Sequence, residues 1–312
     1  MKGKRILVTG AAGFIGSNLV ESLVRDNFVI GVDNFSSGRE ENIAEFTKSP
    51  NFAFKKMDVK DNDMLKREME DVDIVFHLSA NADVRRGYED SSVDFRENVQ
   101  ATYSVLEAMR SKDVKEIVFS STSAVYGNAE IIPTPELYGP LKPISHYGAS
   151  KLSAEAFIFS FSSNYGFKSS IFRFANVVGR KGTHGAISDF IKKLAKDRTT
   201  LEVLGDGTQK KSYIYVDDCV RGITELHGKE DGLFNLGTRG RTTVAEIAEM
   251  TIAKFAPGAK IKYAGGPGGA GWVGDIKYAG LDITKALRNG WKYEIESKEA
   301  VRKAIEDAGA SK

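Results

Sequence analysis

The strongest constraint on the fold of this 312-residue chain is an alternation of short β-branched runs with longer amphipathic segments. Such runs predict parallel strands buried on both faces, and the segments between them repeat apolar residues at helical spacing. The predicted strands are residues 5–10, 28–33, 52–58, 72–80, 115–121 and 169–176, and the predicted helices are 14–25, 62–70, 92–111 and 148–165. This order predicts an α/β fold with a doubly wound parallel sheet.

After about residue 176 the alternation ends, which predicts a smaller, discontinuous α/β lobe. We expect a helix at 186–196, a strand at 201–204, a helix at 243–255, and a loop in the glycine-rich 263–275. We expect a first domain of residues 1–176, to which 213–236 return, and a second lobe built from 177–212 and 237–312.

The charge balance and the apolar runs argue against several classes of protein. Lys and Arg total 44 and Asp and Glu total 42, so we expect no nucleic-acid partner and no anionic membrane surface. No run approaches the roughly 20 apolar residues of a membrane span, and the N-terminus enters a strand without a signal-peptide pattern. A single cysteine, Cys219, cannot form an intrachain disulfide. We expect a cytoplasmic protein.

No metal site is expected either. The histidines lack the spacing of metal ligands; they are His77, His146, His184 and His227.

The first chemical signal lies between the first predicted strand and the first helix. Gly10, Gly13 and Gly16 there allow a tight turn, close approach to a pyrophosphate and close packing of helix on strand. Asp33 ends the next strand, about 20 residues further on, where a carboxylate binds the adenosine ribose and repels a 2′-phosphate. These residues predict a Rossmann-type domain that binds NAD rather than NADP. The alternative is a glycine turn that only packs helix on strand.

The second signal is Tyr147 followed by Lys151 at the start of a predicted helix. Residues at i and i+4 share one helix face, and a nearby ammonium favours the anion of a phenol. Tyr147 can then exchange a proton with a substrate hydroxyl. The alternative for this pair alone is a surface helix on which the tyrosine packs and the lysine is solvated.

Several segments, in order and spacing, resemble the extended short-chain dehydrogenase/reductases, and more narrowly the NAD-dependent nucleotide-sugar epimerase and dehydratase family. These segments are VTGAAGFIG, VDNFSSG, FHLSANADV, ENVQATYSVLEA, FSSTSAVYG, SHYGASKLSAEA and FRFANVVG. LGDGTQKKSYIYVDD and GWVGD are similar to the family's substrate lobe, so the resemblance covers essentially the whole chain.

The resemblance implies a retained NAD and three catalytic residues. Tyr147 is expected as the acid/base, Lys151 as the residue that binds the nicotinamide ribose, and Thr122 as a hydrogen-bond partner of the reacting oxygen; Ser121 is an adjacent hydroxyl. Asp58 is expected near the adenine amino group, and the equally weighted alternative is a turn cap. The implied cofactor-binding residues are Gly10, Gly13, Phe14, Ile15, Gly16, Asp33, Asn34, Asp58, Val59, Leu78, Ala80, Asn98, Ser120, Tyr147 and Lys151.

The resemblance also implies a UDP-sugar substrate. The residues expected to bind it are Thr122, Asn176, Val203, Lys211, Trp272, Asp275 and Ala279. Lys211 and Trp272 stand where many relatives have arginine, and a lysine lacks the bidentate fork of that residue. Phosphate contacts are therefore also expected from nearby cations, for which the candidates are Arg173, Arg180, Lys181 and His184.

Ala124 favours one reaction within the family. Relatives that dehydrate or decarboxylate the sugar resemble STDEVYG or STSEVYG, whereas this chain reads STSAVYG and has neither carboxylate at those positions. A site with NAD and one hydroxyl base can oxidise C4 and reduce it again on the other face, which predicts a UDP-hexose 4-epimerase. Alternatives are a UDP-glucuronate 4-epimerase, an NAD-dependent nucleotide-sugar oxidoreductase and a non-catalytic NAD-binding scaffold.

Two further expectations concern substrate breadth and assembly. Ala279 is small where some related epimerases have a bulky aromatic residue, which predicts room for an N-acetyl group. The helices 92–111 and 148–165 carry apolar residues over much of their circumference, and the resemblance implies that they form a homodimer interface. The alternative is that both helices are buried within the monomer.

Overall fold

The computed structural model describes residues 1–310, except the side chain of Pro267. It divides into two compact units. Unit 1 comprises Met1–Thr122, His146–Arg173 and Val220–Phe234, and unit 2 comprises Ser123–Ser145, Phe174–Cys219 and the chain from Asn235 onward. The expected division differs from this chiefly in 123–145 and 213–219, which belong to unit 2.

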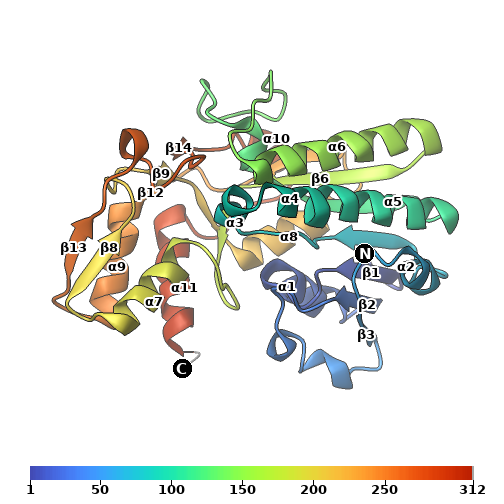
Figure 1. Ribbon diagram of the computed structural model, residues 1–312. Helices are drawn as coiled ribbons and strands as arrows, with labels where there is room; N and C mark the ends of the chain where they lie inside the picture. The colour runs from blue at the N-terminus through green and yellow to red at the C-terminus, as the bar shows by residue number, and fades with distance from the viewer. Residues whose placement is uncertain (311–312) are drawn as a thin grey trace. The chain divides into compact units, whose positions relative to one another are not determined.

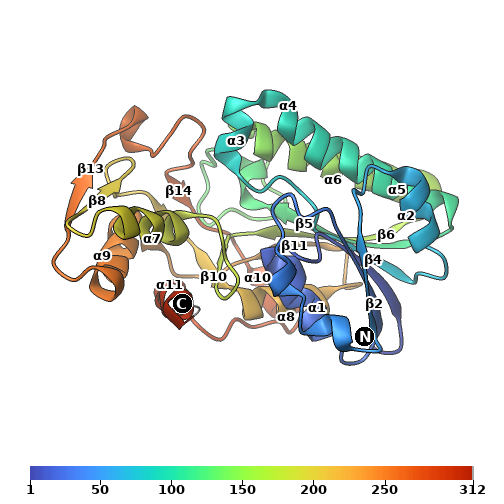
Figure 2. The ribbon, with the colours of Figure 1, turned by 60° about the horizontal axis from the view of Figure 1, so that its bottom comes forward.

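Unit 1 is organised around a seven-stranded sheet of order β11-β6-β5-β4-β1-β2-β3, as Figures 1 and 2 show. The pairs β1–β2, β2–β3, β1–β4 and β4–β5 are parallel, which confirms the doubly wound α/β fold. The strands are β1 (Arg5–Thr9), β2 (Phe28–Asp33), β3 (Phe52–Lys56), β4 (Ile74–His77), β5 (Glu116–Thr122), β6 (Lys168–Phe174) and β11 (Leu233–Leu236).

Helices cover both faces of this sheet. In both ribbon views α1 (Phe14–Leu23) and α8 (Val216–Leu226) lie on one face, and α2 (Asn62–Glu68), α5 (Ala101–Ser111) and α6 (His146–Tyr165) lie on the other. The core between sheet and helices is aliphatic and aromatic; it includes Leu7, Ile30, Val75, Leu106, Met109, Phe119 and Ile158. Burial of this many large side chains is the main stabilising term of such a unit.

The segment 92–111 is helical throughout, as predicted, but it is not a regular α-helix along its whole length. The segment consists of α4 (Ser91–Asp94), a π-helical turn η3 (Phe95–Gln100) and α5. Within the π turn the side chain of Asn98 accepts a hydrogen bond from the Asn81 N–H at 2.8 Å and donates one to Ser150 Oγ at 2.8 Å. Single π turns within helices occur often at functional sites.

Unit 2 contains three small sheets and a second core. β8 (Thr200–Val203) pairs in parallel with β13 (Lys260–Tyr263), and α7 (Ala186–Lys196), α9 (Val244–Phe255) and α11 (Ser297–Ala310) pack with them. A capping box between Thr243 and Glu246 begins α9. The other strands are β7 (Asn176–Val178) with β10 (Tyr213–Tyr215), and β12 (Thr242–Thr243), β9 (Lys210–Lys211) and β14 (Tyr278–Ala279) in that order.

Short elements complete the chain. They are α3 (Val84–Glu89), α10 (Thr284–Arg288) and the 3-10 turns η1 (Glu40–Asn42), η2 (Phe46–Lys48), η4 (Ser123–Tyr126) and η5 (Pro267–Gly269). Within residues 1–310, no helix has the length and apolar character that crossing a lipid bilayer requires.

Candidate active site

The glycine turn after β1 is tightly packed against the neighbouring chain. Gly10 has φ +68°, and a Cβ there would lie 2.9 Å from the backbone nitrogen of Ser79. A Cβ on Gly16 would lie 2.0 Å from the carbonyl oxygen of Gly10. Side chains at either position therefore collide with backbone, so glycine is required for the helix to approach the strand.

The start of α1 is suited to an anion. Gly13 is the N-cap, no side chain caps the helix, and its first turn, which begins with Phe14 and Ile15, holds no acidic residue. The first N–H groups of a helix lack intrahelical partners, and the helix dipole adds positive potential at that end. This end of α1 can therefore bind a pyrophosphate.

Asp33 lies at the carboxyl end of β2, beside the glycine turn, and is 8% exposed. Its Oδ2 accepts the N–H of Ala12 at 3.0 Å and its Oδ1 accepts that of Phe35 at 2.8 Å. Burial raises the pKa of this carboxyl, and the two backbone bonds oppose that rise. Each carboxylate oxygen accepts more than one hydrogen bond, so Asp33 retains capacity for ribose hydroxyls.

Asp58 caps a turn, which is the alternative role that the sequence also allows. Its Oδ1 accepts the N–H of Lys60 at 2.9 Å, and its Oδ2 accepts Nδ2 of Asn34 at 3.1 Å. The expected contact with adenine stays a prediction. Asn34 and Asp58 nevertheless lie together just past the ends of β2 and β3, where α/β sheets bind ligands.

The remaining expected cofactor residues follow the ends of neighbouring strands. Leu78 and Ala80 come directly after β4, and the Leu78 N–H donates to Thr9 Oγ1 at 3.2 Å. Ser120 near the end of β5 donates to the carbonyl of His77 at 3.3 Å. Val59 follows β3, and Asn98 lies in the π turn. All of these residues except Asn98 therefore lie at or near the carboxyl ends of strands of the sheet.

The three expected catalytic residues lie together in unit 1. Thr122 ends β5, Tyr147 is the second residue of α6, and Lys151 follows one helical turn later. The side chain of Thr122 hydrogen-bonds the phenol of Tyr147. Lys151 is 3% exposed, and its Nζ lies 4.4 Å from the centre of the Phe119 ring. This is the arrangement that proton exchange with a substrate hydroxyl requires.

Burial perturbs both titratable members of this group. Burial is the main reason that the pKa of Tyr147 is raised to about 12. The hydrogen bond with Thr122 opposes this rise, and the charge of Asp94 adds to it. Burial lowers the pKa of Lys151 to about 7, and the carboxylates of Glu155 and Asp94 oppose that effect. An ammonium that is partly deprotonated near neutral pH is sensitive to every nearby charge.

Glu155, which sequence reasoning missed, forms a buried ion pair with Arg173. Arg173 Nε donates to Glu155 Oε1 at 3.0 Å and its Nη2 donates to Oε2 at 2.6 Å. The Ser121 hydroxyl also donates a hydrogen bond to Glu155, whereas the Thr122 hydroxyl bonds Tyr147. The expectation that Arg173 contacts a phosphate is wrong, because the residue is 3% exposed and its guanidinium bonds Glu155 within unit 1. The spacing of Tyr147, Lys151 and Glu155 at i, i+4 and i+8 was the available signal.

A buried histidine links the end of β1 to the first turn of α5. His77 Nδ1 lies 2.7 Å from Thr9 Oγ1, and Nε2 lies 3.0 Å from Thr102 Oγ1. Burial lowers the pKa of His77 to about 3, so the ring is neutral at physiological pH. A neutral His77 therefore joins β4 to the neighbouring β1 and to α5 through two threonine hydroxyls.

Unit 2 brings most of the expected substrate residues together. Lys211 Nζ lies 2.6 Å from Asp275 Oδ1 and 5.8 Å from the centre of the Trp272 ring. β9 and β14 pair so that Lys211 lies beside Ala279. Asn176 bonds the carbonyl of Ser212, the residue after Lys211, through both its backbone and its side chain. A cation, a carboxylate and an aromatic ring thus form one cluster.

Four other residues that were expected to bind the substrate or its phosphates lie outside the Lys211–Asp275 ion pair. Val203 is buried at the end of β8, and its carbonyl accepts the N–H of Ala264. Arg180 pairs with Asp217 at 3.0 Å, and His184 is exposed and bonds Thr183. Lys181, beside Arg180, is partly exposed. The expected phosphate contacts of Arg180, Lys181 and His184 stay predictions.

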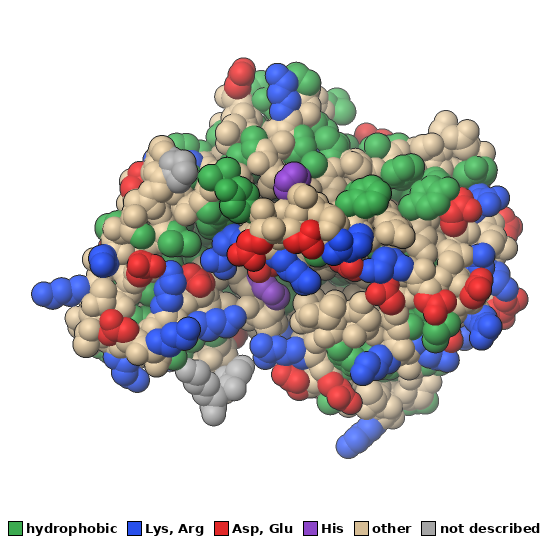
Figure 3. All heavy atoms as spheres, in the orientation of Figure 1, with side chains coloured by type: hydrophobic (Ala, Val, Ile, Leu, Met, Phe, Trp, Pro, Cys, Tyr) green, Lys and Arg blue, Asp and Glu red, His purple; other side chains and the backbone are tan. Residues whose placement is uncertain are grey.

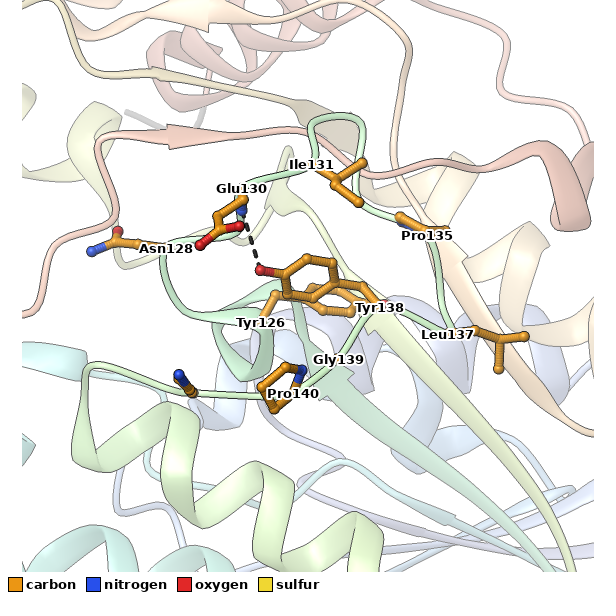
Figure 4. Close-up of a pocket in the computed structure, with 10 residues that line it drawn as sticks. Tyr126, Asn128, Glu130, Ile131, Pro135, Leu137, Tyr138, Gly139 and Pro140 are labelled. Atoms are coloured by element: carbon orange, nitrogen blue, oxygen red, sulfur yellow. Dashed lines mark hydrogen bonds between the residues drawn. The ribbon is translucent and has the colours of Figure 1, made fainter.

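A pocket of about 440 Å³ lies in the loop that follows η4. Figure 4 shows Tyr126, Tyr138 and Pro140 lining it, with Ile131 and Leu137 at its side, and the Tyr138 hydroxyl accepting the Glu130 N–H at 3.2 Å. None of the residues expected to bind cofactor or substrate lines it. The candidate cofactor-binding residues therefore lie at the strand ends of unit 1, and the Lys211 cluster of unit 2 forms a separate group; neither includes this pocket.

The residues of unit 1 fit NAD by their chemistry. The uncapped start of α1 suits the pyrophosphate, and Asp33 suits the adenosine ribose. The charge of Asp33 disfavours a 2′-phosphate at that position. Among the described residues, no group of three His, Cys, Asp or Glu side chains is arranged to hold a metal ion.

Comparison with known proteins agrees with this chemistry. A putative UDP-glucose 4-epimerase of Methanocaldococcus jannaschii is 35% identical over 307 residues, 96% of this chain and 97% of that protein. A crystal structure of a UDP-galactose 4-epimerase is 38% identical, with a TM-score of 0.86 over 98% of this chain and 99% of that one. The UDP-glucuronic acid 4-epimerase of Bacillus cereus, solved with UDP-glucuronic acid and NAD, is 27% identical, with a TM-score of 0.88 over 99% of this chain and 100% of that one.

The sequence profile of the NAD dependent epimerase/dehydratase family matches residues 6–237. Its span includes the glycine turn, Asp33 and the Thr122, Tyr147 and Lys151 group. The cofactor is NAD, and the chain belongs to the NAD-dependent epimerase/dehydratase family.

Proposed function

We propose that this protein is a UDP-hexose 4-epimerase that interconverts UDP-glucose and UDP-galactose through a 4-keto sugar. The observation that carries the proposal is the Thr122, Tyr147 and Lys151 group together with Ala124, where a carboxylate would serve dehydration or decarboxylation. The chain thus has one proton-transfer group for C4 and lacks carboxylates at the two positions used for further steps.

Tyr147 takes the proton of the C4 hydroxyl on its phenol oxygen while C4 is oxidised. When bound, NAD would supply a reversible hydride acceptor for C4, and inversion would require the keto sugar to turn over before C4 is reduced again. Burial raises the pKa of Tyr147 to about 12, so the pKa must fall for this role. A charged ammonium on Lys151 is proposed to favour the phenolate. Thr122 holds the phenol and the sugar oxygen in line, and Tyr147 then returns the proton to C4 of the inverted sugar.

The Lys211 cluster is proposed to hold the UDP part of the substrate. Lys211 supplies positive charge for the diphosphate, and Asp275 accepts ribose hydroxyls. The 2.6 Å pair between them means that an incoming diphosphate competes with Asp275 for the ammonium. Trp272, whose ring lies beside the ammonium, offers a flat face on which the base or ribose can stack.

Ala279 supports a broader substrate range. It lies next to Lys211 across β9 and β14, and its side chain is a single methyl group. A small residue here leaves room for an N-acetyl group, so we include UDP-GlcNAc and UDP-GalNAc among the proposed substrates. The similarity to the Bacillus cereus enzyme supports a second candidate, UDP-glucuronate, in the same C4 reaction.

Exposed aromatic side chains support a homodimer. Phe95, Tyr103, Phe157 and Phe159 are each at least 38% exposed, so the two helical segments are not fully buried within the monomer. Figure 3 shows hydrophobic side chains gathered over α5 and α6. Contiguous exposed apolar surface often marks a protein interface, and a second copy of the chain is the proposed partner.

The test is conversion without added cofactor. Purified protein is incubated separately with UDP-galactose, UDP-GalNAc and UDP-galacturonate, and the C4 isomers are resolved by chromatography. Conversion of UDP-galactose without added NAD supports a self-contained epimerase, and Tyr147→Phe serves as the inactive control. If no sugar is inverted even with NAD supplied, the epimerase proposal is wrong. If only UDP-galacturonate is converted, the second candidate replaces the first.

A further inference from the structure

Asp94 is a buried carboxylate that the proposed mechanism does not use. It is the last residue of α4 and is 1% exposed. Its Oδ1 accepts hydrogen bonds from Asn81 Nδ2 at 2.8 Å and Asn98 Nδ2 at 3.2 Å. Its Oδ2 has no hydrogen-bond partner among the described residues, and a Cβ on Gly87 would lie only 2.0 Å from it. An oxygen of a buried carboxylate without a hydrogen-bond partner raises the free energy of the folded state, so its presence calls for a functional explanation.

The bonds of Asp94 lead to the first turn of α6. Asn98, which bonds Asp94, donates its other Nδ2 hydrogen to Ser150 Oγ at 2.8 Å. Ser150 Oγ in turn donates to the carbonyl of Tyr147 at 2.8 Å. Asp94 is therefore connected to the backbone that carries Tyr147 and Lys151, although it bonds neither side chain.

Ser150, which Asn98 bonds, directly precedes Lys151 on α6, so a negative charge on Asp94 lies near the first turn that carries the lysine. Two carboxylates favour the ammonium form of Lys151, Glu155 and Asp94. Glu155 is neutralised by its ion pair with Arg173. Asp94 has no ion-pair partner in the part of the chain that the structure describes, so its charge remains uncompensated near the lysine.

Other charged groups on the packed elements do not replace this effect. His77 on β4 is neutral above pH 6.5. Burial raises the pKa of Asp94; His146 at the exposed start of α6 opposes that rise, and Asp83, the N-cap of α3, adds to it. Three further charged residues of α3 are exposed: Arg85, Arg86 and Glu89. Those of α4, η3 and α5 form ion pairs: Asp90 with Arg96, Glu97 with Lys60, and Glu107 with Arg110.

We propose that Asp94 is a positioning residue for Lys151, whose buried carboxylate holds the lysine in its charged ammonium form at neutral pH. Without this charge, burial would deprotonate Lys151 further, and Glu155 would be the remaining carboxylate that opposes this. The same charge raises the pKa of Tyr147 directly, so the effect of Asp94 is measured on the lysine and not on the phenol. The inference rests on the proposed function only for the role of Lys151 in catalysis. The effect of Asp94 on the titration of Lys151 can be measured without any sugar.

The direct test is the titration of Lys151 by NMR in protein labelled at the lysine Cε carbons, with the signal assigned through Lys151→Met. In Asp94→Asn, the Lys151 midpoint should fall by on the order of one pH unit, because a nearby negative charge is removed. The matched control is Asp90→Asn, an exposed N-cap of the same helix, which retains a capping oxygen and should leave the midpoint unchanged. An unchanged midpoint in folded Asp94→Asn overturns the proposal.

The wild-type protein provides a second measurement if Asp94→Asn does not fold. The Lys151 signal should show a further inflection on the acid side, where Asp94 becomes protonated, and a single inflection contradicts the coupling. In the C4 reaction, the alkaline limb of the kcat profile should move to lower pH in Asp94→Asn with little change in KM. Loss of stability alone would not move that limb. If the lysine midpoint moves and no sugar is converted, the inference stands and the proposed function fails.

Discussion

The Glu155–Arg173 pair offers a sharp test of how unit 1 is held together. Glu155 is 1% exposed and Arg173 3%, and two hydrogen bonds of 3.0 and 2.6 Å join them. Removing one member of such a pair leaves an uncompensated buried charge, which typically costs about 3–5 kcal/mol in free energy of unfolding. We therefore expect Glu155→Leu or Arg173→Met alone to lower Tm by on the order of 10 °C.

The double variant Glu155→Leu/Arg173→Met should recover most of that loss. Apolar side chains of similar volume do not carry the desolvation cost of two charges, and such replacements are often neutral. The expected coupling free energy is therefore at least about 2 kcal/mol in a double-mutant cycle. Glu107→Leu is the control, because Glu107 and Arg110 form an exposed i,i+3 pair, whose loss should change stability by less than about 1 kcal/mol.

Urea unfolding followed by two signals separates the units. Trp272 and Trp291, the two tryptophans, both belong to unit 2, whereas the Glu155–Arg173 pair lies in unit 1. In the single variants, the urea midpoint measured by far-ultraviolet circular dichroism should therefore fall. The midpoint measured by tryptophan fluorescence should fall less. If the two single effects simply add in the double variant, the argument from an uncompensated buried charge is refuted.

Four further outcomes are expected. Tyr147→Phe should lower kcat for UDP-galactose at least about 100-fold and leave the bound NAD content of the purified protein unchanged. Asp33→Asn should weaken NAD binding and raise the affinity for NADP relative to NAD in calorimetric titrations, because the charge that repels a 2′-phosphate is lost. His77 has a folded pKa of about 3 against an ordinary value of 6.5, so its contribution to stability is present above pH 6.5 and declines as pH falls toward 3; urea midpoints of His77→Gln should depend less on pH in that range. Ala279→Tyr should abolish conversion of UDP-GalNAc and retain that of UDP-galactose, and equal loss of both contradicts the pocket argument.

The periodicity of the sequence predicted much of unit 1. β2 spans the predicted residues 28–33, and β1, β3, β5 and β6 differ from prediction by one or two residues at their ends. Local rules were enough here because buried parallel strands require apolar runs and each crossover helix needs one apolar face. The interruption of 92–111 by a π turn escaped prediction, because it depends on the contacts of Asn98 with Asn81 and Ser150, which lie on other elements.

For the candidate site as well, local features were predictable from the sequence and contacts between distant residues were not. Tyr147 and Lys151 were predictable because their spacing on one helix turn is a local property, and the glycine turn is equally local. The sequence alone determined the order of strands and helices and the presence of a dinucleotide turn and a Tyr/Lys pair. Only the tertiary structure decided which partners these side chains have. Ser121 bonds Glu155 while Thr122 bonds Tyr147, Arg173 is a buried partner of Glu155, and Asp94 is buried against Asn81 and Asn98. Burial and partner choice depend on residues distant in the chain, and they set the charge that a side chain carries.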